Sequence, residues 1–304
     1  MRTTIVIVAV TSLCLSFPTS AAQSTAFRLT AVHRNLSYVT NGHPRQTLDL
    51  YLPTPPAVRT WLTTPANGYQ TKLPLVIWIH GGGFLVGSKD DTVPLELLPQ
   101  GYAVASIGYR VSSDAKFPAQ VEDCKASIRW LRANAARFAL DPERFAVFGE
   151  SAGGYLAAML GTTGDAKEFD VGENLDRSSR VQAVIDFFGP TDFLQNTLAV
   201  ASVKTPEALL IGGAILENKD KAAKANPIAY VTRDDPPFLV VHGDADNLVP
   251  YNQSELLEVA LKKANVPVTF HTVRGGGHGG FTDGRIGPMV TKFIADHLLG
   301  FPRR

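Results

Sequence analysis

Runs of consecutive apolar residues alternate, from residue 73 onward, with segments whose apolar residues recur at helical spacing. The apolar runs are short, as expected for strands of a parallel sheet that is covered on both faces. They predict strands at 75–79, 102–107, 145–148, 181–188, 238–242 and 267–273. Helices are predicted near 93–99, at 118–138, directly after residue 151, at 252–264 and at 288–299. Strands and helices in this order predict an α/β fold, with a mostly parallel, twisted sheet and helices on both faces.

Two parts of the chain depart from this alternation. Residues 27–52 alternate apolar and polar positions around turn residues at 40–44, which predicts an antiparallel hairpin. The Pro- and Thr-rich segment 53–72 is expected to be an exposed connection, and the polar segment 162–180 a surface loop. Residues 190–236 contain two candidate short helices. We expect them to form a small cap insertion and not a second domain.

The first 22 residues have the pattern of a secretory signal peptide. Arg2 provides a positive start, residues 5–15 are mostly apolar, and residues 20–22 are small enough for cleavage. The apolar run is short for a membrane-spanning helix, which needs about 20 residues. We therefore expect a secreted or periplasmic protein without a membrane segment, whose mature chain (23–304) is a single domain. A retained anchor or a buried N-terminal strand is the alternative.

Composition narrows the classes of partner and cofactor. With 304 residues, 45% of them hydrophobic, the chain can bury a large core. The 29 basic and 28 acidic residues nearly cancel and no basic block occurs, which argues against a nucleic-acid partner. Removal of the signal would leave Cys124 as the single cysteine, predicted to be a buried structural thiol. No cluster of His, Cys and Asp has metal-ligand spacing, so neither a metal nor an organic cofactor is expected.

The clearest chemical motif is a Gly-x-Ser-x-Gly turn at 149–153, between an apolar strand pattern and a helix-forming run. A strand, a sharp turn and a helix are the context of a nucleophile elbow. The glycines beside Ser151 permit a strained backbone and close packing of neighbouring elements. The pattern predicts Ser151 as a nucleophile; an ordinary serine in a strand–helix loop is the alternative.

Two later strands also end in reactive residues. Asp244 and Asp246 follow the strand at 238–242, and His278 lies in a glycine-rich loop after the strand at 267–273. Ligands of doubly wound sheets bind at the carboxyl ends of the strands. A serine hydroxyl is a weak nucleophile until an imidazole takes its proton, and a carboxylate orients that imidazole. The order Ser, Asp, His along the chain is that of an α/β-hydrolase.

The base and the acid each have competitors. His278 is preferred as the base because its glycine loop has no apolar periodicity that would bury it, whereas His242 ends a strand in a loop expected to have another role. Asp246 is preferred as the acid because it lies further out from its strand than Asp244. Asp244 is expected to bond its own loop backbone, as aspartates do in turns. Asp192, which also follows a strand, is the third candidate.

A run of three glycines, at 81–83, follows His80 at the end of the strand at 75–79. Glycines let backbone N–H groups turn inward without side chains in the way. Such donors, together with the N–H of Ala152, would hold the oxyanion of a tetrahedral intermediate. A phosphate-binding loop is the alternative, but no Gly-Lys-Ser/Thr follows the glycines.

With these residues assembled, the chain resembles α/β-hydrolase esterases of the hormone-sensitive-lipase type. More closely, it is similar to bacterial esterases grouped with bifunctional feruloyl/acetyl-xylan esterases (BD-FAE-like proteins). The resemblance covers roughly residues 45–299 and rests on His80-Gly81-Gly82-Gly83, Tyr109-Arg110, the segments 117–124, 149–154 and 242–246, and Gly277-His278-Gly279. The chain lacks the helical N-terminal cap of the larger lipases of this type.

The resemblance implies a serine ester hydrolase that acts on short-chain acyl, acetyl or feruloyl esters through an acyl-enzyme. It assigns Ser151 as nucleophile, Asp246 as acid and His278 as base, and as oxyanion donors the N–H groups of Gly82, Gly83 and Ala152. It implies an ester substrate, small or linked to a polysaccharide, and no cofactor. Two alternatives remain: a peptidase of the prolyl-oligopeptidase type, and a non-enzymatic binding protein on a hydrolase fold.

Overall fold

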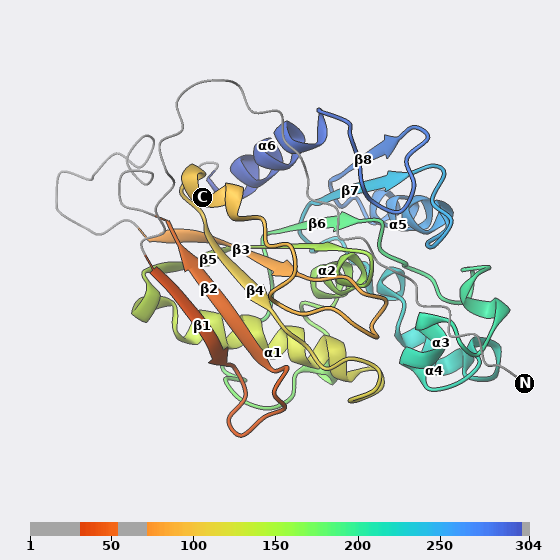
Figure 1. Cartoon of the computed structure of the whole chain (residues 1–304), viewed down its shortest axis with the longest axis horizontal. Helices are drawn as coiled ribbons and strands as arrows, with labels where there is room; N and C mark the ends of the chain where they lie inside the picture. Colours follow the sequence, from red (N-terminus) through yellow and green to blue (C-terminus); the bar gives the residue numbers. More distant parts are fainter. Residues whose placement is uncertain (1–30, 54–71, 300–304) are drawn as a thin grey trace, which may run out of the picture.

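A computed structural model describes residues 31–53 and 72–299. The predicted signal peptide and nearly all of the predicted connection at 53–72 lie outside these residues. Within them, eight strands form one sheet in the order β1-β2-β4-β3-β5-β6-β7-β8 (Figure 1). In chain order the strands are β1 Ala31–Ser37, β2 Thr47–Leu52, β3 Leu73–Ile79, β4 Ala103–Ile107, β5 Leu140–Glu150, β6 Ala183–Phe187, β7 Phe238–Gly243 and β8 Val268–Val273.

The predicted hairpin extends the parallel sheet at one edge. β1 pairs antiparallel with β2, and β2 pairs antiparallel with β4, where Leu50 lies opposite Ala105. All pairs from β4 to β8 are parallel. The turn between β1 and β2 begins at Tyr38, which is 1% exposed and donates its hydroxyl to the carbonyl of Gly108. The turn is therefore longer than the predicted 40–44, because Tyr38 leaves the strand to enter the core.

Helices cover both faces of the sheet (Figure 1). Alternate residues of β3 point to opposite faces: Ile77 belongs to a core shared with α1, α2 and α5, and Trp78 to a core shared with α6. The α-helices are α1 Ala119–Ala133, α2 Ala152–Thr162, α3 Pro206–Ile211, α4 Lys219–Lys224, α5 Asn252–Lys263 and α6 Ile286–Leu298. The 3₁₀ helices are η2 Leu95–Gln100, η3 Ala135–Phe138, η4 Lys167–Phe169, η5 Ala199–Ala201, η6 Ile215–Glu217 and η7 Pro227–Tyr230. The predicted α/β class is confirmed.

Two predicted helices differ from the observed ones. The helix expected at 118–138 is interrupted at Asn134, the C-cap of α1, whose backbone N–H and side-chain amide both donate to the carbonyl of Trp130. The helix expected near 93–99 is the 3₁₀ helix η2, which contains Pro99. A proline has no N–H to continue an α-helix. Cys124, on α1, is fully buried as predicted.

The segment 162–180 is not simply the surface loop that its polar composition predicts. Asp170 from this segment pairs with Lys125 at 3.0 Å and with Arg129 at 3.1 Å, and both cationic side chains are 1% exposed. Phe169 beside them is also buried. Buried charges require partners, so the segment is held against α1 by an ionic cluster that composition does not reveal.

The insertion at 190–236 contains the short helices α3 and α4, as the sequence predicts. It lies next to the glycine loop, because a Cβ added to Gly83 would be 3.3 Å from Pro206 of α3. Its role as a cap stays a prediction. Among the residues described, no helix combines the length and apolar character needed to cross a membrane.

Candidate active site

The predicted nucleophile lies on a sharp turn between β5 and α2. Ser151 has φ 56° and ψ −120°, a strained conformation that costs on the order of 1–3 kcal/mol for a non-glycine residue. Its backbone N–H donates to the carbonyl of Phe187 at 2.8 Å. A Cβ on Gly149 would lie 2.2 Å from the carbonyl oxygen of Gly153. The glycines therefore allow the turn to close with the serine hydroxyl at its tip.

The structure brings Ser151, His278 and Asp246 into one line of hydrogen bonds. Ser151 Oγ lies 2.9 Å from Nε2 of His278, and Nδ1 of the same ring lies 2.7 Å from Oδ2 of Asp246. An ionised carboxylate only accepts, so Nδ1 carries the hydrogen and Nε2 is left to accept the serine proton. The Asp246 side chain is fully buried and that of His278 is 16% exposed.

The carboxylate of Asp246 is held on both oxygens. Oδ1 accepts the N–H groups of Leu248 at 2.8 Å and Val249 at 3.0 Å. Oδ2 accepts from His278 and also from Nε2 of His242 at 3.1 Å. Burial by itself raises the pKa of Asp246, but the hydrogen bonds from His242 and His278 outweigh it and hold that pKa well below its usual range. The carboxylate is therefore anionic.

The two competing aspartates have other partners. Asp244 accepts the backbone N–H of Gly275 at 2.6 Å and pairs with the Arg274 side chain at 3.1 Å. Both partners lie on the loop after β8, whereas the sequence predicted a bond within the loop of Asp244 itself. Asp192 accepts from Asn226 Nδ2 at 2.7 Å and from two backbone N–H groups at the start of the insertion. Neither makes a hydrogen bond to His278 in the described structure.

The glycine loop lies next to the serine, because a Cβ added to Gly81 would be 3.4 Å from Cβ of Ser151. Gly82 and Gly83 have φ values of 106° and 60°, and a Cβ on Gly82 would lie 2.4 Å from the carbonyl oxygen of Val86. Among the described residues, no hydrogen bond uses the N–H of Gly82, Gly83 or Ala152. The loop therefore leaves donors available for an oxyanion.

His80 supports this loop, and among the described residues its Nε2 has no hydrogen-bond partner. Its ring stacks on Tyr109, with centroids 4.4 Å apart, and its Nδ1 lies 2.8 Å from the carbonyl oxygen of Gly81. Burial lowers the pKa of His80 to about 4, so the ring is neutral at neutral pH and donates from Nδ1. Arg45, from the β1–β2 turn, donates to the carbonyl of Gly87 at 2.8 Å at the end of the loop.

Sequence reasoning missed two residues that shape the site. Phe188 packs the edge of its ring against His278, with centroids 4.6 Å apart, and has a strained φ of 46°. In the sequence it looks like one more apolar residue at the end of a strand. Glu150, next to the nucleophile, is the other: burial raises its pKa, and the charge of His278 acts in the opposite direction. The position of Glu150 inside the Gly-x-Ser-x-Gly turn is the sequence feature that could have identified it.

A buried acid lies behind the turn and gives a prediction about stability. Asp186 on β6 is fully buried; Oδ1 accepts from Gly189 N at 2.9 Å, while Oδ2 has no partner among the described residues. Burial raises the pKa of Asp186 from 3.8 to about 6, and the Gly189 bond and His242 oppose that rise. The folded state therefore binds more protons between about pH 4 and 6, and stability falls as pH rises through that window.

The side-chain amide of the variant Asp186→Asn cannot ionise. When the pH is raised from 4 to 8, we therefore expect the unfolding free energy of this variant to increase by up to ~3 kcal/mol relative to that of the wild type. Thermal unfolding of both proteins at the two pH values measures this difference. The same difference in unfolding free energy at both pH values would show that Asp186 does not titrate in this range.

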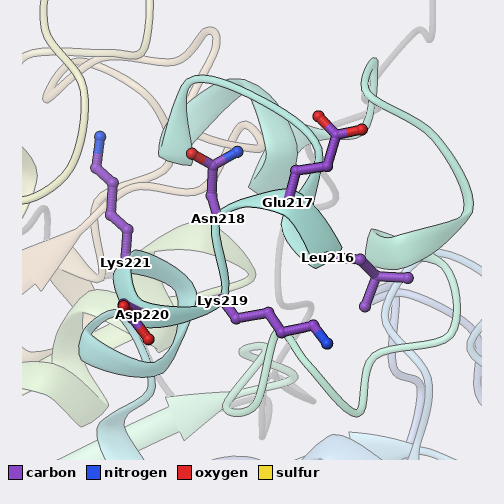
Figure 2. A pocket seen from close by; sticks show the side chains of 6 residues that line it. All are labelled: Leu216, Glu217, Asn218, Lys219, Asp220 and Lys221. Carbon is purple, nitrogen blue, oxygen red and sulfur yellow. The ribbon is translucent and has the colours of Figure 1, made fainter.

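A surface hollow of about 510 Å³ lies on the insertion and has no reactive centre. Figure 2 shows that the side chains that line it come from the end of η6, Asn218 and the start of α4 and do not converge on one point: Leu216, Glu217, Asn218, Lys219, Asp220 and Lys221. Lys221 donates a hydrogen bond from Nζ to the carbonyl of Ile211 at 2.6 Å. Within the described part of the chain, no three His, Cys, Asp or Glu side chains gather closely enough to hold a metal ion.

The sheet, its helices and the solved structures that resemble them define an α/β-hydrolase fold. The chain belongs to the BD-FAE family, whose model matches residues 62–261. The fold class and the family resemblance expected from the sequence are thus confirmed.

Named relatives and solved structures agree with this placement. Esterase LipC of Mycobacterium tuberculosis is 32% identical over 71% of this chain and 56% of its own length. The chain spans about half the length of the curated relatives it matches first. A truncated carbohydrate esterase from gut microbiota superposes with a TM-score of 0.80 at 34% identity, over 89% of this chain and 97% of that one. A bifunctional GH43-CE protein of Bacteroides eggerthii gives a TM-score of 0.77 at 34% identity, over 87% of this chain and 38% of that one.

Proposed function

We propose that the protein is a serine carboxylic-ester hydrolase. The observation that carries this proposal is the line of hydrogen bonds from Ser151 through His278 to Asp246. The glycine loop lies near its serine end, because a Cβ added to Gly81 would be 3.4 Å from Cβ of Ser151. Acyl transfer needs a nucleophile, a base, an orienting acid and oxyanion donors, and the chain has a candidate for each. The relatives named as esterases and carboxylesterases support the same reaction class.

In the proposed reaction, Ser151 Oγ attacks the ester carbonyl carbon while Nε2 of His278 takes the hydroxyl proton. The N–H groups of Gly82, Gly83 and Ala152 hold the carbonyl oxygen as it becomes an oxyanion. His278 then gives the proton to the leaving alcohol, and an acyl ester remains on the serine. Water repeats the sequence: His278 takes its proton, the tetrahedral intermediate collapses, and the acid is released as Ser151 Oγ regains the proton.

For the substrate we propose short-chain acyl esters, including acetyl or feruloyl esters linked to polysaccharide. The carbohydrate esterase that superposes over nearly its whole length supports this class. Phe188 is buried and packs against His278, so the surroundings of the proposed base are partly apolar.

A panel of p-nitrophenyl acetate, butyrate and octanoate, methyl ferulate and acetylated xylan tests the reaction and the substrate class together. We expect the acetate to be turned over with a higher kcat/KM than the octanoate. Cleavage of peptides without cleavage of any ester would contradict the proposal and favour the peptidase alternative.

We also propose that the protein is secreted or periplasmic and is cleaved after Ala22. The support is the signal-like pattern of the first 22 residues, which lie outside the described part. N-terminal sequencing of the exported protein tests this, and a chain that still begins at Met1 would contradict it.

A further inference from the structure

A second imidazole contacts the carboxylate that orients His278. His242, near the end of β7, places Nε2 3.1 Å from Oδ2 of Asp246, the same oxygen that accepts from His278. The side chains of His242 and Asp246 are both fully buried. Solvent therefore cannot replace this donor if it is removed.

The partners of His242 define which of its ring nitrogens carries hydrogen. Nε2 faces two oxygens that can only accept, Oδ2 of Asp246 and the carbonyl of Val249, each at 3.1 Å. Nε2 must therefore carry the hydrogen. Nδ1 lies 2.8 Å from Oγ of Ser254 on α5, and in the neutral ring this nitrogen accepts the hydroxyl hydrogen. The ring thus bridges α5 and the carboxylate.

We propose that His242, oriented by Ser254, is a positioning residue for the ester hydrolysis: its N–H holds Asp246 ionised and turned toward His278. The inference rests on the proposed function, because His242 touches Asp246 and not the serine or the reacting ester. A continuous path of hydrogen bonds then runs from Ser254 through His242, Asp246 and His278 to Ser151.

The reaction explains why a second donor matters. When His278 accepts the serine proton it becomes a cation, and Asp246 must face it as an anion in a fixed orientation. Hydrogen bonds to a charged group are about twice as strong as those between neutral groups. A buried carboxylate that loses one of them is a stronger base and is less well oriented.

Few other titratable groups surround His242. His278 approaches the same oxygen from the β8–α6 loop, and Asp186 lies on the neighbouring strand β6, where its charge interacts with His242. The ring of Tyr251, next to α5, lies 5.6 Å from the His242 ring between centroids. Neither Asp186 nor Tyr251 has a hydrogen bond to the His242 ring, so the direct effect of a substitution falls on Asp246 and Ser254.

Two substitutions separate hydrogen bonding from packing. His242→Phe keeps a ring of similar shape without a donor, and His242→Gln keeps an amide N–H near the place of Nε2. With p-nitrophenyl acetate we expect His242→Phe to lower kcat about 10- to 100-fold, the loss that fits one charge-assisted hydrogen bond. KM should change little, because the substrate is not touched. We expect His242→Gln to recover most of the lost kcat.

The pH profile and a proton resonance give readouts that a packing role would not move. Without the second donor, Asp246 holds the protonated His278 ring more tightly, so the acidic fall in kcat/KM moves to higher pH in His242→Phe. The low-field proton resonance of the bond between His278 and Asp246 needs no substrate. We expect it to shift in His242→Phe and to stay close to the wild-type position in His242→Gln.

A matched pair of serine variants completes the test. Ser254→Ala removes the hydroxyl behind the ring and is expected to lower kcat several-fold. Ser127→Ala removes another fully buried helical hydroxyl, which donates to the carbonyl of Cys124 at 2.8 Å, and is expected to match the wild type. If His242→Phe does not fold, His242→Gln and the serine pair still decide the question.

Three results would overturn the inference. The first is a wild-type kcat and proton resonance in His242→Phe. The second is an equal loss in the Phe and Gln variants that follows their melting temperatures. The third applies if His242→Phe does not fold: Ser254→Ala and Ser127→Ala would then have the same kcat and the same position of the proton resonance. Failure of the proposed function would look different: the wild type would not hydrolyse esters at all, while the resonance would still report on the His242 contact.

Discussion

Ser151→Ala is expected to lower kcat for p-nitrophenyl acetate by about 10⁴- to 10⁶-fold, as loss of the nucleophile does in enzymes with this constellation. Alanine can occupy the same strained turn, because the serine side chain bonds only to His278 in the described structure. The melting temperature is therefore expected to stay close to that of the wild type. Steady-state turnover and thermal unfolding of the same preparation measure both effects.

The comparison depends on the fold being kept. A circular-dichroism spectrum equal to that of the wild type would show that the sheet and helices are intact. Turnover within tenfold of the wild type in such a folded variant would mean that another group carries the chemistry.

Asp246→Asn is expected to lower kcat by about 10⁴-fold, the loss seen when the orienting acid becomes an amide in such a triad. The backbone N–H groups of Leu248 and Val249 require an oxygen at the Oδ1 position, so the amide NH₂ would occupy the Oδ2 position. There it would face His278 Nδ1 with hydrogens, and the ring would have to accept at Nδ1 and carry its own hydrogen on Nε2. A ring in that tautomer cannot take the proton of Ser151.

Asp244→Asn is the matched control for this substitution. Its side chain bonds Gly275 and Arg274 on an exposed loop, and the amide oxygen can still accept from Gly275. We expect its kcat to stay close to that of the wild type. Equal losses in the two variants would contradict the assignment of Asp246 as the acid.

The sequence was sufficient to predict the sheet because parallel strands covered on both faces are apolar without interruption. It was less informative where burial depends on distant partners. Lys125 and Arg129 look like solvent-exposed charges on a helix, and only the folded chain shows that Asp170 neutralises them inside. The helix ends at Asn134, whose side chain also bonds to the carbonyl of Trp130, and apolar periodicity carries no sign of such a bond.

The candidate site divides in the same way. Ser151 and His278 both lie in glycine-rich motifs after predicted strands. These motifs, together with the order Ser, Asp, His along the chain, were sufficient to predict both residues as site candidates. The contact of His242 with Asp246 could not be predicted from the sequence, because it requires the loop after β7 to fold back on its own strand. The bond from His242 to Ser254 likewise depends on how α5 packs. The positive φ of Phe188 has no signature in an apolar run at the end of a strand.

Covalent labelling of Ser151 tests the central claim most directly. A fluorophosphonate probe reacts with an activated serine, and mass spectrometry of the digested protein identifies the modified residue. The account predicts one adduct per chain, on the peptide that contains Ser151, and none in the Ser151→Ala variant. A folded wild-type protein that takes up no probe, or takes it up at another serine, would contradict the account.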